Sequence, residues 1–326
     1  MTDVNAYTGR TVFITGASGI VGSWLVRSLL ASGVSVVALV RDEDPRSEFV
    51  RSGDDQRVAR AHGSLEDLAL LERLLVQYEV EVVFHLGAQT QVRHAQQHPW
   101  GTMEANVRGT YNLLEAVRRN ATRIKALVVA SSDKAYGDSS TLPYTEEHAL
   151  AGRNIYDASK SAADLLTSAY ATSFGLPSGI ARCGNIYGPG DLNWERIVPG
   201  TMRSLIRGER PIIRSDGTLR RDYLHVDDAG AGYLALGAAL ISGREHGEAF
   251  NFGNGEGISV LRLVDEIGQA VGRVDLAPVI YGDAPNEIPA QWLDATKAQT
   301  RLGWSPSLAL PDGLRRTVAW YRNAIG

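Results

Sequence analysis

The expected fold of this chain follows mainly from the stretch Thr11-Val12-Phe13-Ile14-Thr15-Gly16-Ala17-Ser18-Gly19-Ile20-Val21-Gly22. Its first five residues are β-branched or aromatic, which is the composition of a buried strand. Three glycines follow, with two residues between each pair, and a helical apolar pattern begins there. An ordinary tight turn also uses glycines. A strand that turns into a helix here predicts a dinucleotide site, because main-chain N–H groups can approach a diphosphate.

The segments after this unit repeat its pattern of short apolar strands and amphipathic helices. Strands are predicted at 34–40, 80–86, 125–130 and 179–182, and helices at 68–78, 105–119 and 156–174. Such alternation predicts an α/β fold with a Rossmann-like, doubly wound parallel sheet and helices on both faces. The charged stretch 41–60 is predicted to be a solvated loop and helix.

The pattern changes after about residue 184, where glycine and proline become frequent and the strands become short. We therefore expect a dinucleotide-binding domain with the catalytic residues at 1–183. Residues 184–326 are expected to form mainly a smaller substrate lobe, whose segments interleave with the first domain. No linker-like composition separates the two parts.

Composition narrows the class of protein. The net charge of −4 gives no reason to expect nucleic acid as a partner. The sequence shows no signal peptide and no apolar run long enough to cross a membrane. Its single cysteine, Cys183, is consistent with a reducing cytoplasm. The histidines and carboxylates lack metal-binding spacing, so no metal is expected. A cytoplasmic protein without membrane or nucleic-acid partners is the expectation.

The end of the second predicted strand bears on the choice of cofactor. An acidic residue there binds the 2′-hydroxyl of NAD, whereas an arginine accommodates the 2′-phosphate of NADP. The sequence has both, Arg41 followed by Asp42. Because Arg41 comes first, the order slightly favours NADP over NAD. The alternative is that both are solvated loop charges.

Acid–base chemistry is indicated by the stretch Ser131–Lys160. Tyr156 and Lys160 are four residues apart on a predicted helix, so their side chains share a face. An ammonium at that distance is expected to lower the pKa of the phenol. The tyrosine could then accept the proton of a sugar hydroxyl while hydride leaves the same carbon for a nicotinamide. Chance pairs of this kind are common on exposed helices, but here the pair follows the glycine turn and a strand that ends in Ser131-Ser132.

The chain resembles the extended short-chain dehydrogenases/reductases, and within them the nucleotide-sugar epimerases and dehydratases. The glycine spacing and the Tyr156/Lys160 pair carry the resemblance. It extends to His85–Gln89, Asn106–Thr110, Arg182–Gly190, Arg221–Asp228, Leu293–Lys297 and Leu302–Pro306. One departure lies at Ser64, where many members have an aspartate that contacts adenine.

The resemblance implies roles for individual residues. The residues implied to bind the cofactor are Gly16, Ser18, Gly19, Ile20, Gly22, Arg41, Ser64, Leu65, Leu86, Ala88, Gln89, Tyr156 and Lys160. Those implied to bind a nucleotide-diphosphate sugar are Gln89, Asn185, Val198 and Arg221. The helices 105–119 and 156–174 are implied to form a homodimer through a four-helix bundle. His85 and Cys183 are expected to be packed structural residues.

The triplet Ser132-Asp133-Lys134 separates the possible reactions. An epimerase needs only the hydroxyl of Ser132 to assist Tyr156. A 4,6-dehydratase also needs a base for the C5 hydrogen and an acid for the departing C6 hydroxyl. Asp-Lys at this place resembles the CDP-glucose 4,6-dehydratases. The alternative is that the two side chains form a local ion pair on a loop.

The predicted function is therefore a nucleotide-sugar 4,6-dehydratase that yields a 4-keto-6-deoxyhexose by internal hydride transfer from C4 to C6. Its predicted catalytic residues are Ser132, Asp133, Lys134, Tyr156 and Lys160. The alternatives are a nucleotide-sugar 4-epimerase and a non-catalytic NAD(P)-binding scaffold. The identity of the base and of the sugar stays open.

Overall fold

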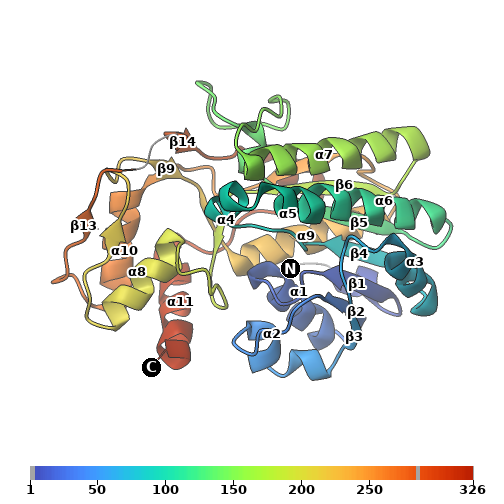
Figure 1. Cartoon of the computed structure of the whole chain (residues 1–326), viewed down its shortest axis with the longest axis horizontal. Coiled ribbons are helices and arrows are strands. Elements are labelled where there is room, and N and C mark those ends of the chain that lie inside the picture. Colours follow the sequence, from blue (N-terminus) through green and yellow to red (C-terminus); the bar gives the residue numbers. More distant parts are fainter. Residues whose placement is uncertain (1–3, 284–286, 326) are drawn as a thin grey trace.

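The computed structural model describes residues 4–283 and 287–325, which form a sheet domain and a smaller lobe (Figure 1). The sheet has seven parallel strands in the order β11-β6-β5-β4-β1-β2-β3. Their bounds are β1 Thr11–Thr15, β2 Ser35–Val40, β3 Ala59–His62, β4 Val82–His85, β5 Ala126–Ser132, β6 Ser178–Cys183 and β11 Ala249–Phe252. The strand order reverses beside β1, where ligands bind in doubly wound sheets.

Helices cover both faces of the sheet. Helices α1 (Ile20–Ala31) and α9 (Val226–Ile241) pack together on one face. Helices α3 (Leu68–Gln77), α6 (Gly109–Arg119) and α7 (Ile155–Phe174) cover the other. Shorter helices connect these elements: α2 Glu48–Arg51, α4 Val92–Gln97 and α5 Pro99–Met103, with a π-helical turn at Glu104–Arg108 before α6.

The smaller lobe lies at the left of Figure 1. Its helices are α8 Ile197–Ile206, α10 Val260–Val271 and α11 Leu310–Ile325. Its short strands are β7 Asn185–Tyr187, β8 Ile212–Ile213, β9 Arg220–Arg221, β10 Tyr223–His225, β12 Ile258–Ser259, β13 Val279–Ile280 and β14 Ala290–Gln291. They form three small sheets, β10-β7, β12-β9-β14 and β13-β8.

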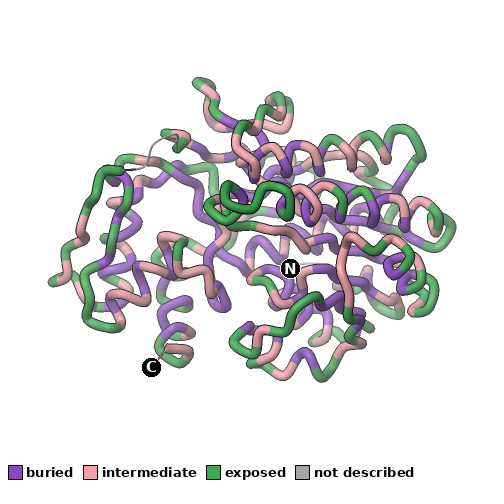
Figure 2. The backbone as a smooth tube through the Cα atoms, in the orientation of Figure 1, coloured by how far each residue is buried: buried purple, intermediate pink, exposed green. Residues whose placement is uncertain are grey.

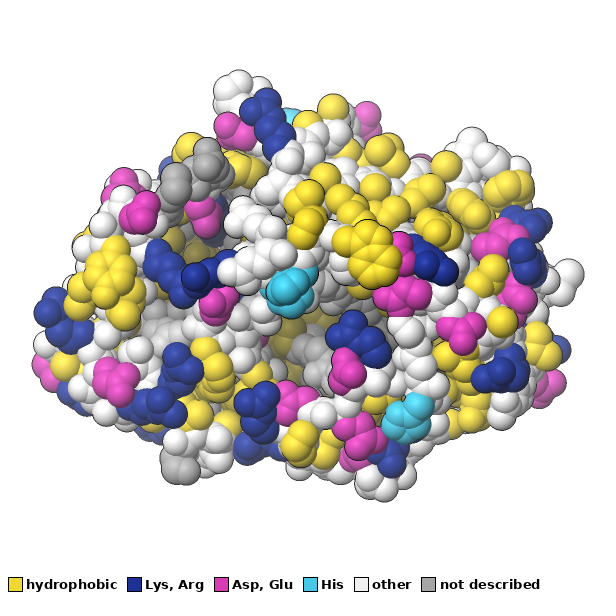
Figure 3. Space-filling model, in the orientation of Figure 1, with side chains coloured by type: hydrophobic (Ala, Val, Ile, Leu, Met, Phe, Trp, Pro, Cys, Tyr) yellow, Lys and Arg dark blue, Asp and Glu magenta, His cyan; other side chains and the backbone are white. Residues whose placement is uncertain are grey.

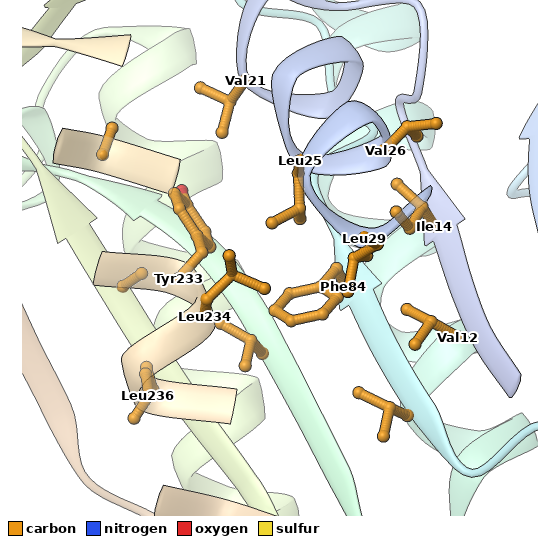
Figure 4. Packing of buried hydrophobic residues seen from close by; sticks show 14 of the residues in the cluster. Val12, Ile14, Val21, Leu25, Val26, Leu29, Phe84, Tyr233, Leu234 and Leu236 are labelled. Atoms are coloured by element: carbon orange, nitrogen blue, oxygen red, sulfur yellow. The ribbon is translucent and has the colours of Figure 1, made fainter. Parts of the chain in front are cut away.

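The core lies on the two faces of the large sheet. Figure 2 shows buried residues concentrated along its strands. On the α1/α9 face, Phe84 of β4 and Leu25 of α1 pack in one cluster with Tyr233 and Leu234 of α9 (Figure 4). A second cluster joins the strands to α3 and α6 on the opposite face. Apolar strands buried on both sides are what a parallel sheet requires.

The strands and helices predicted from the sequence are present, with ends that shift by a few residues. The prediction for 41–60 was incomplete, because β3 begins at Ala59 and joins the sheet beside β2. Glu48 and Asp54 are also buried there, where both accept hydrogen bonds from Arg27. The segment is therefore anchored to α1 rather than only solvated.

Residues beyond 183 complete the large sheet. Helix α9 packs against β5 and β6, and β11 pairs with β6 from Ala249↔Ile180 to Phe252↔Cys183. The Tyr7 hydroxyl also donates a hydrogen bond to the main-chain oxygen of Leu234, 2.6 Å away. Within the described ranges, none of the helices combines the length and apolar character that crossing a bilayer requires.

Candidate active site

A large cleft opens at the carboxyl ends of the sheet strands, between the sheet and the smaller lobe. Figure 3 shows this face of the molecule hollowed between the two parts. The cleft has a volume of about 2080 Å³. Pockets for one small ligand usually measure roughly 300–1,000 Å³. There is space for two ligands, such as a dinucleotide and a nucleotide sugar.

The glycine turn forms one wall of the cleft. Gly16 has a φ of +77°, and a Cβ there would lie 2.7 Å from the main-chain nitrogen of Gly87. A Cβ on Gly22 would lie 2.0 Å from the Gly16 oxygen. The N-terminus of α1, capped by Gly19 without a side-chain hydrogen bond, faces the cleft. These features fit a dinucleotide, because the bare main chain can approach a diphosphate at a helix N-terminus.

Most residues predicted to bind the cofactor line this cleft. The set comprises Gly16, Ser18, Gly19, Ile20, Gly22, Arg41, Ser64, Leu65, Leu86, Ala88, Tyr156 and Lys160. Gln89 is not among the lining residues that the structure gives for the cleft. Its main-chain N–H donates to Asn106 and its side-chain oxygen accepts from the Gln91 main chain. Its predicted contacts with cofactor and substrate are therefore not supported by its position.

His85 is buried at the end of β4, where it bridges two threonine hydroxyls. Its Nδ1 lies 2.8 Å from the Thr15 hydroxyl and its Nε2 lies 3.0 Å from the Thr110 hydroxyl. The Thr15 hydroxyl also accepts a hydrogen bond from the main-chain N–H of Gly87. Burial lowers the pKa of His85 to about 3, so the ring is neutral. His85 is a packed structural residue, as the sequence indicated.

Tyr156 and Lys160 lie one turn apart on α7, and both are buried beside the cleft. The Lys160 ammonium donates to the Ala130 oxygen, 3.1 Å away, which fixes the side chain against the end of β5. Burial lowers the pKa of Lys160 to about 8. Burial and the Asp133 and Asp157 carboxylates raise the pKa of Tyr156, and a hydrogen bond with Ser132 lowers it. The net lowering predicted from Lys160 is not found, because burial raises the pKa of Tyr156 and Lys160 is not among the main groups that shift it.

Ser132, Asp133 and Lys134 lie at the end of β5 and in the short helical turn that follows. The Ser132 hydroxyl donates to Asp133 Oδ1, 3.0 Å away, and accepts from the main-chain N–H of Lys134. Asp133 Oδ2 is buried and has no hydrogen-bond partner among the described residues. Burial, followed by the nearby Arg221 guanidinium, lowers the pKa of Lys134. Its ammonium contacts Gln291 and not Asp133, so the local ion pair is not what holds it.

The predicted substrate residues lie on the opposite wall. Asn185 on β7 has a buried Nδ2 without a hydrogen-bond partner in the described part of the chain. Val198 is near the N-terminus of α8. Arg221 on β9 is 6% exposed, and its Nη2 lies 2.8 Å from Glu287 Oε2. The Arg221 guanidinium and the unpartnered Asn185 amide belong to residues that line the same cleft, and both groups suit phosphate oxygens. In this structure Glu287 pairs with one edge of the guanidinium.

Two further residues belong to the site and were not singled out from the sequence. Asp157 lines the cleft on α7 and is 2% exposed, and its Oδ1 has no hydrogen-bond partner in the described chain. Burial raises the pKa of Asp157 to about 6. Gln291 reaches Lys134 from the smaller lobe. A signal existed only for Asp157, which lies between Tyr156 and Lys160 in the sequence.

The sheet order, the glycine turn and the Tyr156–Lys160 pair define an extended short-chain dehydrogenase/reductase. Residues 13–317 match the sequence model of the family described as GDP-mannose 4,6 dehydratase. The chain belongs to this family.

Known proteins similar to this chain include both dehydratases and epimerases. The CDP-glucose 4,6-dehydratase of Salmonella typhimurium is 33% identical over 340 residues, which covers 99% of this chain and 93% of the relative. The dTDP-glucose 4,6-dehydratase of Streptomyces venezuelae, solved with NAD, has a TM-score of 0.86 and 29% identity, with 96% and 97% of the two chains covered. The UDP-glucose 4-epimerase of Thermotoga maritima, solved with UDP-glucose, has a TM-score of 0.88 and 27% identity, with 97% and 100% covered.

Proposed function

We propose that the protein is a nucleotide-sugar 4,6-dehydratase that converts an NDP-hexose into an NDP-4-keto-6-deoxyhexose. The observation that carries the proposal is the position of Asp133 and Lys134 directly beside Ser132 in the cleft. The similarity to a CDP-glucose 4,6-dehydratase over nearly the whole chain supports it. A cytosine base and glucose are the leading analogy for the substrate.

Tyr156 is proposed to accept the proton of the C4 hydroxyl. A bound nicotinamide supplies the acceptor and later the donor of hydride. Ser132 stabilises the phenolate through its hydrogen bond, which already lowers the pKa of Tyr156. Lys160 adds a positive charge one helical turn away, which favours the ionised phenol. Together these residues perform the oxidation that dehydratases and epimerases share.

Asp133 and Lys134 are proposed to perform the elimination. Oxidation at C4 acidifies the C5 hydrogen, and Lys134 accepts that proton in its neutral form. The lowered pKa of Lys134 increases the neutral fraction at a given pH. Asp133 is proposed to donate a proton to the departing C6 hydroxyl, and its unpartnered Oδ2 is the atom available to do so. An epimerase requires neither group, and a scaffold requires none of the catalytic set.

Asn185, Val198 and Arg221 are proposed to bind the nucleotide diphosphate. All three line the same wall of the cleft. The Glu287 carboxylate occupies one edge of the Arg221 guanidinium, and its side chain is 51% exposed. A diphosphate would exchange with this carboxylate on Arg221, because both offer oxygen pairs to the same donors.

The cofactor is NAD or NADP, and we propose a slight preference for NADP. Arg41 follows β2, lines the cleft and has a side chain that is 68% exposed, as a 2′-phosphate ligand requires. Its Nε lies 2.6 Å from the Asp42 carboxylate, which could instead accept the 2′-hydroxyl of NAD. Titration of both dinucleotides with the wild type and Arg41→Ala distinguishes them. Only NADP affinity should fall in the variant, and a larger loss for NAD would contradict the preference.

The proposed assembly is a homodimer through α6 and α7. Tyr111, Leu165 and Phe174 on these helices have exposed fractions of 39%, 57% and 55%. Neighbouring exposed apolar side chains on packed helices favour burial against a second copy. The proposed location is the cytoplasm, where the free, buried thiol of Cys183 stays reduced.

Lys134→Ala tests the proposed reaction. Holoenzyme is incubated with a panel of nucleotide sugars, and the 4-keto-6-deoxy product is measured by its alkali-induced absorbance. The variant should lose the product by at least ~100-fold while C4 oxidation continues, because only the elimination uses Lys134. The exposed Lys125 gives a matched control, Lys125→Ala, that should keep wild-type activity. Normal product formation by Lys134→Ala would refute the assignment, and isomerisation without loss of water would indicate an epimerase.

A further inference from the structure

Gln291 is buried against the amine of Lys134. It is 0% exposed, and its Oε1 lies 2.5 Å from Lys134 Nζ. Its Nε2 is also buried and has no hydrogen-bond partner in the described part of the chain. Placing a side-chain amide in a protein interior costs free energy unless its polar atoms are used. The structure gives the amide two side-chain neighbours, the Lys134 amine and the Tyr144 hydroxyl, and the shorter contact is the one with Lys134.

The main chain holds Gln291 in a fixed position. Strand β14 pairs with β9, which places Gln291 beside Arg221. The main-chain oxygen of Gln291 accepts a hydrogen bond from the main-chain N–H of Asp222, 3.1 Å away. On the other side, the N–H of Tyr144 donates to the Trp292 oxygen at 2.9 Å. These contacts on both sides allow little movement of the amide. The residue that touches Lys134 is therefore tied to the same small sheet as the proposed phosphate ligand Arg221.

Charged groups surround Lys134 from several elements. Arg221 on β9 disfavours its ammonium form, whereas Asp133, Asp157 and Glu287 favour it. Gln291 differs from these groups because it is neutral. Its carbonyl oxygen can accept an N–H from either the amine or the ammonium, so it fixes direction without adding charge. A carboxylate at the same place would instead hold Lys134 in the ammonium form.

We propose that Gln291 is a positioning residue for the elimination, which orients the neutral amine of Lys134 so that its lone pair faces C5 of the sugar. The inference rests on the proposed dehydratase function. With one N–H directed at Gln291 Oε1, the second N–H and the lone pair of the tetrahedral nitrogen share the two remaining positions, and we place the lone pair in the one that faces the cleft. Proton transfer depends on such alignment.

The step that Gln291 serves is balanced within the site. The C5–H bond breaks and its proton forms a bond to the Lys134 nitrogen. The electron pair of that bond becomes the C5–C6 double bond as the C6–O bond breaks. The departing oxygen takes its proton from the carboxylic acid form of Asp133, which is left as the carboxylate, and it leaves as water. Gln291 neither gains nor loses a proton, so it acts only through Lys134.

Two substitutions with opposite electrostatic effects test the proposal on the complete holoenzyme. Gln291→Met removes the acceptor at similar volume, and kcat for the dehydration should fall ~10–100-fold with little change in KM. Gln291→Glu keeps an acceptor but adds charge. Its rate should be low near neutrality and recover as the pH rises, because the carboxylate raises the pKa of Lys134. Ala290→Ser, on the same strand, is the control and should match the wild type.

C4 oxidation is followed separately, from the rate effect of deuterium at C4. Melting temperatures check that the variants are folded. Both variants should oxidise C4 at the wild-type rate and melt within a few degrees of it. A wild-type pH profile in Gln291→Glu, or an equal fall of oxidation and elimination in both variants, would leave only a structural role and overturn the proposal. A wild type that dehydrates no nucleotide sugar would instead overturn the proposed function, and this inference with it.

Discussion

Arg182 of β6 and Asp164 of α7 form a bidentate ion pair, with both nitrogen–oxygen distances at 2.8 Å. Their side chains are only 7% and 1% exposed. Arg182 also donates to the hydroxyl of Tyr136 and to the main-chain oxygen of Glu146. The pair thereby joins β6 to α7 and to the segment after β5. This contact therefore helps to fix the positions of β5 and α7, which carry the proposed catalytic residues.

Arg182→Met should lower the free energy of unfolding by about 3–5 kcal/mol, because it leaves the Asp164 carboxylate buried without its partner. Denaturant unfolding measures the change. The double variant Arg182→Met/Asp164→Leu removes both charges and should recover much of the loss. If the double variant is as unstable as the single one, the unpaired charge is not the cause.

Gly22→Ala should weaken dinucleotide binding by ~10-fold or more and lower stability by about 1–3 kcal/mol. The added methyl group would lie 2.0 Å from the Gly16 oxygen, so the turn must move. Gly230→Ala is the matched control, because Gly230 lies within α9 and a Cβ there meets nothing within 4 Å. It should raise stability by about 0.5–1 kcal/mol. Dinucleotide titration and thermal melting test both, and unchanged affinity in Gly22→Ala would contradict the prediction.

Asp157→Asn should change how stability depends on pH. Burial raises the pKa of Asp157 to about 6, from 3.8. A raised carboxyl pKa contributes stability that is complete below about pH 4 and is lost as the pH rises through about 6. The variant lacks this loss, so its stability relative to the wild type should rise across that window, by up to about 3 kcal/mol. Denaturant unfolding from acidic to neutral pH measures it, and a constant difference would show that Asp157 does not titrate there.

Leu165→Glu should convert the proposed dimer into a monomer. The side chain is 57% exposed on α7 and would meet its own copy across a two-fold axis, where a buried charge is costly. Val274→Glu is a matched control on the smaller lobe, at 75% exposure. Sedimentation at several concentrations reports the mass. A wild type that is already monomeric, or a dimer that survives in Leu165→Glu, would argue against this interface.

The sequence predicted the layered fold because the sheet strands are apolar on both faces, and the parallel pairing with helices on both faces followed from their alternation with helices. It missed β3, whose sequence Ala59-Arg60-Ala61-His62 has no apolar run. Only Ala61 of that strand is buried. It also gave no sign that Ala249–Phe252 would join β6, because nothing local identifies a partner so distant along the chain.

The candidate site was predictable where its residues follow one another in sequence. Ser132, Asp133 and Lys134 stand together, and Tyr156 and Lys160 share a helical face. Gln291 was not predictable, because it reaches Lys134 only through the pairing of β14 with β9. The net pKa of Tyr156 also depends on burial, which spacing does not report.

Helix α9 and strand β11 come late in the chain, so the large sheet cannot be completed until both have been synthesised. A nascent chain that has passed residue 183 holds β6 with one edge unpaired, and Phe84 lacks the cover of Tyr233 and Leu234. Tyr7 is synthesised early, and its hydroxyl can donate to the main-chain oxygen of Leu234 only after Leu234 has been added. Synthesis proceeds from the N-terminus, and open sheet edges are prone to aggregation. We therefore expect the catalytic half to need protection until residue 252 has been made, since folding of the sheet cannot finish earlier.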